Sequence, residues 1–143
     1  MNKSIATKSE QLLNRYSLKK TELRLKLIEI FLQDKRSFSQ GEIIELMEKN
    51  NQAADRVSVY RNLNQLKLAG IIHEIESNKY VSCSHDCEKH AHVLLYCQSC
   101  EKHTEIKDHD KLTRFFEALG GFQFLSPSRA VFLKGICQPC SRL

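Results

Sequence analysis

Side chains that bind metal ions are concentrated between Cys83 and Glu105. This stretch holds four of the six cysteines and four of the six histidines, and the chain has no Cys or His before His73. Thiolates and imidazoles are the ligands that zinc prefers in proteins. We therefore expect the second half of the chain to be organised by bound metal, and the first half to serve a different purpose.

Two C-x-x-C pairs, Cys97 with Cys100 and Cys137 with Cys140, predict a structural zinc site. This spacing lets both sulfurs of a pair reach one metal from a tight turn. Two pairs supply a tetrahedral set of four thiolates with no open coordination position. The 36 residues between the pairs exceed the usual zinc-ribbon gap, and an inserted helix and strand account for them. A thiol–disulfide redox pair is the alternative for these residues.

The first half of the chain has the pattern of a winged helix-turn-helix. Four segments with helical periodicity are predicted as helices: 8–16, 21–34, 39–50 and 56–69. Their expected end signals are Thr21, Ser39 with Glu42 in a capping box, Asp55, and Gly70 as a left-handed cap. Two alternating β-branched segments, 71–75 and 79–82, predict a hairpin after the last helix. Compact helices followed by a hairpin are typical of this DNA-binding unit.

The helix predicted at 56–69 is the expected recognition helix. In a helix-turn-helix it enters the major groove and presents residues of its first turns. Here these residues are Arg56, Ser58, Tyr60 and Arg61. Most of the net charge of +5 also lies in this half of the chain, which favours a polyanionic partner. The alternative is that these side chains only solvate a core helix, with Tyr60 partly buried.

The remaining segments predict a small α/β unit. The expected strands are 92–97, 103–106, 122–125 and 130–136, with a helix at 108–119. A unit of under about 60 residues rarely has a sufficient core of its own, so metal or oligomerisation is expected to stabilise it. The fold class is therefore α+β, a winged helix-turn-helix followed by a small α/β domain.

The N-terminal sequence and the hydropathy pattern predict a cytoplasmic protein. The first residues lack the apolar segment of a signal peptide, and no run approaches the roughly 18 apolar residues of a membrane span. A reducing compartment agrees with thiolates that bind metal instead of forming disulfides.

Taken together, these motifs resemble the ferric uptake regulator (Fur) family of bacterial metal-sensing repressors. The matching pieces are Thr21-x-x-Arg24, the segment 57–63 (VSVYRNL), Gly70-Ile71-Ile72, the His-rich loop and both C-x-x-C pairs. The resemblance implies a homodimer that binds AT-rich inverted repeats in promoters of metal-uptake genes when it is loaded with metal. It also implies a winged-helix domain at 1–83, a hinge loop at 84–91, and a dimerisation and zinc-binding domain at 92–143.

Within this family the chain is most similar to the zinc uptake regulator (Zur) branch. By that resemblance the sensor zinc is bound by His73, Cys83, His90 and Glu105. With the four-cysteine site this gives two zinc ions per subunit, one structural and one regulatory. His85, Cys87 and His92 are rival ligands in the same loop, whereas His103 and His109 are expected to be solvated.

Phosphate contacts are expected from Lys19, Lys20, Arg24 and Lys79. Rival functions are an iron, manganese or peroxide sensor of the same family, a thiol redox switch through Cys83 and Cys87 or the C-x-x-C pairs, and a zinc hydrolase with Glu105 as general base. The hydrolase is disfavoured because four protein ligands leave no open position. No enzymatic activity, membrane partner or small-molecule substrate is therefore predicted.

Overall fold

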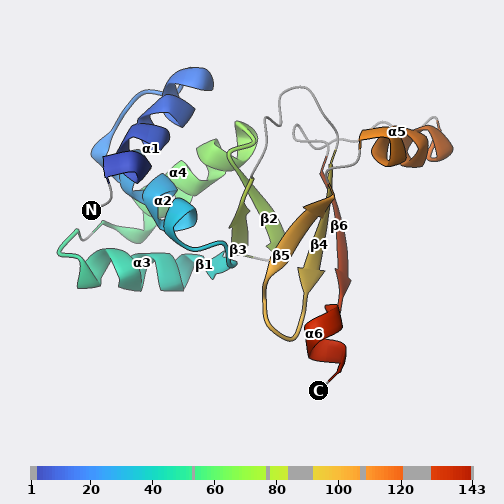
Figure 1. Ribbon diagram of the computed structural model, residues 1–143. Helices are drawn as coiled ribbons and strands as arrows, with labels where there is room; N and C mark the ends of the chain where they lie inside the picture. The colour runs from blue at the N-terminus through green and yellow to red at the C-terminus, as the bar shows by residue number, and fades with distance from the viewer. Residues whose placement is uncertain are drawn as a thin grey trace.

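Six helices and six strands are found in the computed structural model, which describes residues 3–52, 54–76, 78–83, 92–106, 109–120 and 130–142 (Figure 1). In chain order they are α1 (Lys3–Arg15), α2 (Glu22–Gln33), β1 (Phe38–Ser39), α3 (Gln40–Lys49), α4 (Arg56–Leu68), β2 (Ile72–Glu76), β3 (Lys79–Ser82), β4 (His92–Cys97), β5 (His103–Ile106), α5 (His109–Ala118), β6 (Ala130–Gly135) and α6 (Gln138–Ser141). The predicted α+β class is confirmed.

The helix starts are those that the capping residues predict. Thr21 accepts a hydrogen bond from the Arg24 amide at the start of α2, and Asp55 accepts one from the Ser58 amide at the start of α4. At α3 the Ser39 hydroxyl and the Glu42 carboxylate form the complete capping box. Each cap satisfies an amide that the helix itself leaves unpaired. The first helix is longer than expected, since α1 begins at Lys3 instead of residue 8.

The wing is a three-stranded sheet in the order β1-β3-β2. Strands β2 and β3 form the predicted antiparallel hairpin, with His73 opposite Val81. Strand β1 adds two residues to the outer side of β3, where Phe38 pairs with Tyr80. It was not predicted, because two residues are too short to show strand periodicity.

A single apolar core holds α1 to α4 against this sheet. Its fully buried members include Leu13, Leu27, Ile43, Leu63 and Ile72. The apolar residues of the 56–69 segment predict a buried side that consists of Val59, Leu63, Leu66 and Leu68. The prediction is confirmed for the first three, whose side chains are 0% exposed. It is wrong for Leu68, which lies in the last turn and is 57% exposed.

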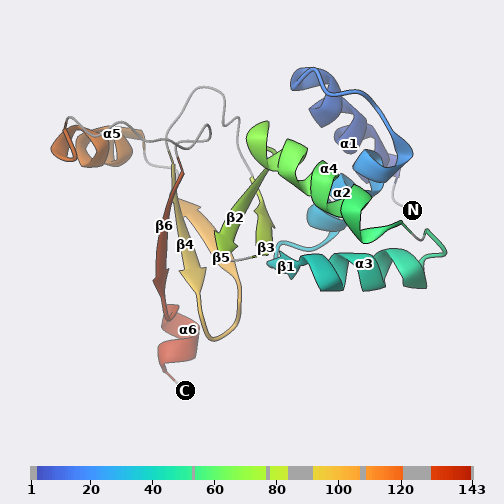
Figure 2. The ribbon, with the colours of Figure 1, turned by 180° about the vertical axis from the view of Figure 1, so that it is seen from behind.

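The second sheet has the order β5-β4-β6. The chain runs from β4 antiparallel into β5 and returns after α5 as β6, parallel to β4. A parallel partner requires such a long crossover connection, which explains the separation of the two C-x-x-C pairs. Helices α5 and α6 lie at opposite ends of this sheet (Figures 1 and 2). The strand predicted at 122–125 lies outside the described residues.

The two sheets touch through a small apolar cluster, here named the sheet–sheet contact. It consists of Ile75 and Val81 from the wing, Tyr96 from β4 and the partly buried Phe132 from β6. In both ribbon views, β2 of the wing is the strand that lies beside β5 of the second sheet (Figures 1 and 2). No helix among the described residues is long and apolar enough to cross a membrane.

Gly70 ends α4 in a Schellman motif and provides a test of this fold. Its φ is 81°, the Gly70 amide donates to the Lys67 carbonyl, and the Ile71 amide donates to the Leu66 carbonyl. We expect Gly70→Ala to lower the free energy of unfolding by about 1–2 kcal/mol, because a Cβ disfavours the left-handed region. The measurement is urea denaturation. Leu68→Ala, at an exposed site two residues earlier, should change it by less than about 0.5 kcal/mol; equal effects would contradict this role of Gly70.

Candidate functional site

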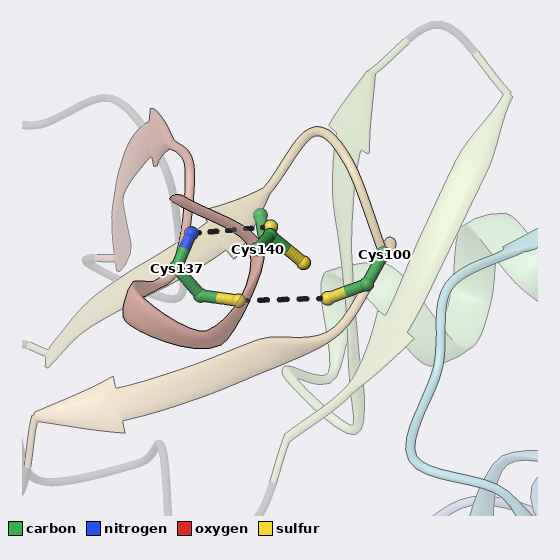
Figure 3. A group of neighbouring side chains, drawn as sticks. Cys100, Cys137 and Cys140 are labelled. Carbon is green, nitrogen blue, oxygen red and sulfur yellow. Dashed lines mark hydrogen bonds between the residues drawn. The ribbon is translucent and has the colours of Figure 1, made fainter. Parts of the chain in front are cut away.

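The four cysteines of the C-x-x-C pairs form one compact cluster. All four sulfurs lie within 4.8 Å of one another, and the Sγ atoms of Cys100 and Cys137 are 3.8 Å apart. Cys100 comes from the turn after β4, and it faces Cys137 and Cys140 at the start of α6 (Figure 3). Within the described part of the chain, this is the one group of three or more ligand side chains close enough to share a metal ion.

Local backbone structure explains how the two pairs meet. The Glu101 amide donates to the Cys97 carbonyl, and Glu101 has a φ of 59°, so residues 97–102 form a tight turn, here named the knuckle. Strand β6 runs beside β4 with Gly135 opposite Cys97. This register delivers Cys137 to the knuckle two residues later. The sequence predicts the knuckle, and the parallel pairing supplies the second half of the site.

The cluster fits a tetrahedral zinc ion. Zinc–sulfur bonds of about 2.3 Å in a tetrahedron place the sulfurs about 3.8 Å apart, which is the separation of Cys100 and Cys137. The Cys137 amide, which donates to Cys97 Sγ at 3.2 Å, is the main cause that lowers the pKa of Cys97 to about 6. Hydrogen bonding with Cys137 and other neighbouring thiols raises the pKa of Cys140 to about 12. The pKa values of these two thiols thus shift in opposite directions when no metal is bound. A bound divalent cation would lower the pKa of both, because a coordinating thiol is deprotonated outright.

The predicted sensor ligands do not form a second cluster in the described structure. His73 lies on β2, is 2% exposed, and its ring packs edge-on against Phe132 with centroids 5.9 Å apart. Cys83 follows β3, and its amide donates to the Ile71 carbonyl. Glu105 lies on β5 opposite Leu94. These three residues are not close enough to share a metal ion here, and the assignment stays a prediction.

His85, Cys87 and His90 lie outside the described residues, as does the side chain of His92 on β4. Cys83 is disulfide-bonded in this structure, whereas the four cysteines of the cluster are free thiols. Because only a thiolate binds zinc, a sensor site that includes Cys83 requires its reduced form.

His103 is a candidate ligand that the sequence interpretation passed over. It was expected to be solvated, but its Nδ1 is buried and has no hydrogen-bond partner among the described residues. Burial is also the main cause that lowers the pKa of His103. The residue lies two positions before Glu105 on β5, and alternate residues of a strand share a face. The signal that could have found it is the H-x-E spacing on a predicted strand.

The first turns of α4 present an open surface. Val57 is 59% exposed and Tyr60 is 53% exposed, and the Arg56 and Arg61 side chains are also exposed. Tyr60 is therefore exposed and not partly buried, whereas exposed side chains fit both DNA contact and simple solvation of the helix. This exposure is what groove-facing residues require, while their contact with DNA stays a prediction.

Three of the basic residues predicted to contact phosphates, Arg24, Lys20 and Lys79, have partners within the protein. Arg24 donates from Nε to Asn62 Oδ1 at 3.0 Å, from one terminal nitrogen to the Lys19 carbonyl at 2.7 Å, and from the other to the Gln65 side chain. Two of these acceptors lie on α4, so Arg24 ties α2 to that helix. Lys20 pairs with Glu10 at 3.2 Å, and Lys79 pairs with Glu101 at 2.8 Å. The DNA contacts of all these residues stay predictions.

Comparison with known proteins agrees with this geometry. Residues 15–126 match the profile described as "Ferric uptake regulator family". The ferric uptake regulation protein of Bordetella parapertussis is 30% identical over 133 residues, which cover 91% of this chain and 94% of that protein.

Among solved structures, a zinc uptake regulator complexed with zinc and DNA superposes with a TM-score of 0.73 at 22% identity, covering 97% of this chain and 94% of that chain. The holo form of the protein XcZur superposes with a TM-score of 0.74 at 24% identity, covering 98% and 99%. At these identities the two structures bear on the fold alone.

Substitution of one cluster cysteine tests the metal centre. We expect Cys137→Ser to lose one zinc ion per subunit and to unfold or aggregate, since zinc binding contributes about 10–16 kcal/mol in small finger peptides. Metal analysis of the purified protein and thermal denaturation measure this. Ser141→Ala, close by in α6 but without a ligand atom, should keep its zinc. A folded Cys137→Ser protein with unchanged zinc content would exclude the site.

Proposed function

The chain belongs to the ferric uptake regulator family, and we propose that it is a zinc-responsive, dimeric repressor of metal-uptake genes. Membership makes it a metal-responsive DNA-binding regulator and not an enzyme. The observation that carries the finer proposal is the placement of Cys83 and Glu105. Cys83 directly follows β3 of the wing sheet, and Glu105 lies on β5 of the second sheet. One metal ion bound by both would fix the wing relative to the second sheet.

Operator DNA is the proposed macromolecular ligand, read by α4. The Arg61 guanidinium can donate two hydrogen bonds to a guanine edge, and Tyr60 can contact a thymine methyl group. The network of Arg24 with Asn62 and Gln65 orients α4 on α2. This network supports the proposal because a rigid helix presents base-contacting residues in a fixed register.

A second copy of the chain is the proposed partner of the outer face of the second sheet. Leu95 of β4 and Leu133 of β6 are directly opposite each other and are 40% and 47% exposed. Phe115 of α5 and Ile136 after β6 are also large exposed apolar residues, at 38% and 62%. Their neighbours Leu94 and Tyr96 are buried, at 1% and 4%. Adjacent apolar residues left on one face support dimerisation through that face.

Zinc is the proposed effector because of the ligand chemistry. The assigned set is His73, Cys83, His90 and Glu105. One soft thiolate, two imidazoles and one carboxylate suit tetrahedral zinc better than iron or manganese. The proposal is also supported by the shared fold of a zinc uptake regulator complexed with zinc and DNA and of holo XcZur. With the four-cysteine site, the proposal requires two zinc ions per subunit in a cytoplasmic protein.

An iron or manganese sensor is the second candidate, because the curated relatives are named ferric uptake regulation proteins. The two candidates differ in which metal restores operator binding to protein that retains only its structural zinc. Restoration by zinc at lower free concentrations than Fe(II) or Mn(II) supports the zinc proposal. Restoration by Fe(II) or Mn(II) at lower free concentrations than zinc would contradict the zinc proposal and favour an iron or manganese sensor.

The proposed mechanism is a metal-dependent shift between two arrangements of the wing. Zinc favours the DNA-competent arrangement if it binds that arrangement more tightly than the other. A change from 1% to 99% of the competent form needs about 5.5 kcal/mol of differential binding. This is less than the about 10–16 kcal/mol that zinc supplies in finger peptides.

The Cys83→Ser variant tests the sensor assignment. We expect it to keep the structural zinc and the dimer, because Cys83 is not in the four-cysteine cluster. It should lose the second zinc ion and zinc-dependent operator binding. Zinc analysis, sedimentation and operator titration under reducing conditions measure these properties. Operator affinity equal to wild type at limiting zinc would show that Cys83 is not a sensor ligand.

The Arg61→Ala variant tests base readout by α4. Loss of a bidentate contact to a base should weaken operator binding by about 1–3 kcal/mol and leave binding to random DNA nearly unchanged. A phosphate contact would weaken both and reduce the salt dependence. Titrations with operator and random duplexes at several salt concentrations distinguish the two. Equal losses on both DNAs would contradict base readout.

A further inference from the structure

We propose that the knuckle of the four-cysteine site holds the wing in its DNA-competent position, through a contact that is separate from the sensor metal. This contact, here named the latch, consists of the Lys79–Glu101 ion pair and the β-bridge between Arg36 and Lys102. The inference rests on the proposed function and adds a second group of residues that sets the zinc response.

The ion pair of the latch joins the wing directly to the metal site. Lys79 is the first residue of β3, and its Nζ lies 2.8 Å from Glu101 Oε1. Glu101 follows the ligand Cys100, and its left-handed backbone and its hydrogen bond to the Cys97 carbonyl belong to the knuckle turn. The position of this carboxylate therefore depends on the fold of the knuckle.

The β-bridge adds a backbone contact at the same place. Arg36, just before β1, pairs with Lys102 in antiparallel orientation. The Lys102 carbonyl also accepts a hydrogen bond from the Cys97 amide at 2.9 Å. Arg36 is fixed on its own side, because its guanidinium donates to Glu42 at 2.8 Å and lies 4.1 Å from the centre of the Phe38 ring. A residue next to the wing, held by its own side-chain contacts, thus pairs with a residue of the knuckle.

The sheet–sheet contact extends from the latch toward the proposed sensor ligands. Val81, two residues after Lys79, is 0% exposed, and it packs with Ile75 and Tyr96. His73, directly opposite Val81, packs on Phe132. The wing is therefore held at the knuckle by the latch and, in the proposed function, near His73 and Cys83 by zinc.

Two attachments of one wing act on the same conformational equilibrium. A latch that stabilises the competent arrangement reduces the differential binding that zinc must supply. Lys79 and Glu101 are 29% and 45% exposed, and ion pairs of this kind contribute modestly in solvent. We therefore expect loss of the pair to raise the half-saturating zinc concentration about two- to fivefold.

A phosphate contact by Lys79 makes a different prediction. If Lys79 bound DNA, Glu101→Gln would remove a competing carboxylate and strengthen operator binding. With the latch, the same substitution weakens operator binding at limiting zinc although the protein becomes more positive. The sign of the effect separates the two roles.

The test compares zinc titrations of operator binding for Glu101→Gln, Lys79→Gln and the charge exchange Lys79→Glu with Glu101→Lys. All variants should keep the structural zinc and the dimer. We expect both single variants to need about two to five times more zinc than wild type, and the charge exchange to recover most of that loss. Glu117→Gln on α5 and Lys49→Gln at the end of α3 make the same charge changes at exposed positions outside the latch and should titrate like wild type.

Hydrogen exchange without DNA provides a second readout. Amides of residues 79–82 and 98–102 should exchange faster in Glu101→Gln than in Glu117→Gln at saturating zinc. Unchanged exchange, or a Glu101→Gln titration that moves to lower zinc, would overturn the latch. Failure of the proposed function is distinguishable, because then wild type itself shows no zinc-dependent operator binding, and the exchange comparison still decides whether the latch exists.

Discussion

Four sulfur atoms within 4.8 Å of one another are the constraint on which the second half of the chain depends. Few of the described residues of this half are buried, and its sheet leaves Leu95 and Leu133 partly exposed. Apolar packing alone is therefore a weak source of stability for so small a unit. A zinc ion bound by the cluster would join the end of β4 to the start of α6. That link would fix the parallel pairing of β4 and β6.

Residues next to the four-cysteine cluster also contact the other half of the chain. Glu101 and Lys102 follow directly after Cys100, and both contact the wing region, through Lys79 and Arg36. The two proposed metal sites differ in their ligands, and this difference suits one to a structural role and the other to a regulatory role. Four thiolates make a closed site suited to stability, whereas a mixed set of nitrogen, sulfur and oxygen ligands is more easily emptied and refilled. In the proposed scheme both sites act on one element, the wing.

Basic residues in the winged helix have two different uses. Arg61 and Arg56 are exposed on the first turns of α4. The Arg24 guanidinium, in contrast, donates hydrogen bonds to the side chains of Asn62 and Gln65 and to the Lys19 carbonyl. A planar group with several donors can hold two helices in register, which a lysine cannot do in the same way. The exposed charges of α4 are thus positioned by an arginine whose hydrogen bonds lie within the protein.

The sequence by itself determined the features that depend on local chemistry. Capping by Thr21, Ser39 and Asp55, the knuckle spacing and the limits of β4 and β5 all follow from neighbouring residues, so they were predictable. Only the tertiary structure decided the partners of Arg24 and Lys79 and the burial of the Nδ1 atom of His103. These depend on residues distant in the chain, such as Gln65 and Glu101. Side-chain type states what a residue can bind, and the fold decides which partner lies within reach.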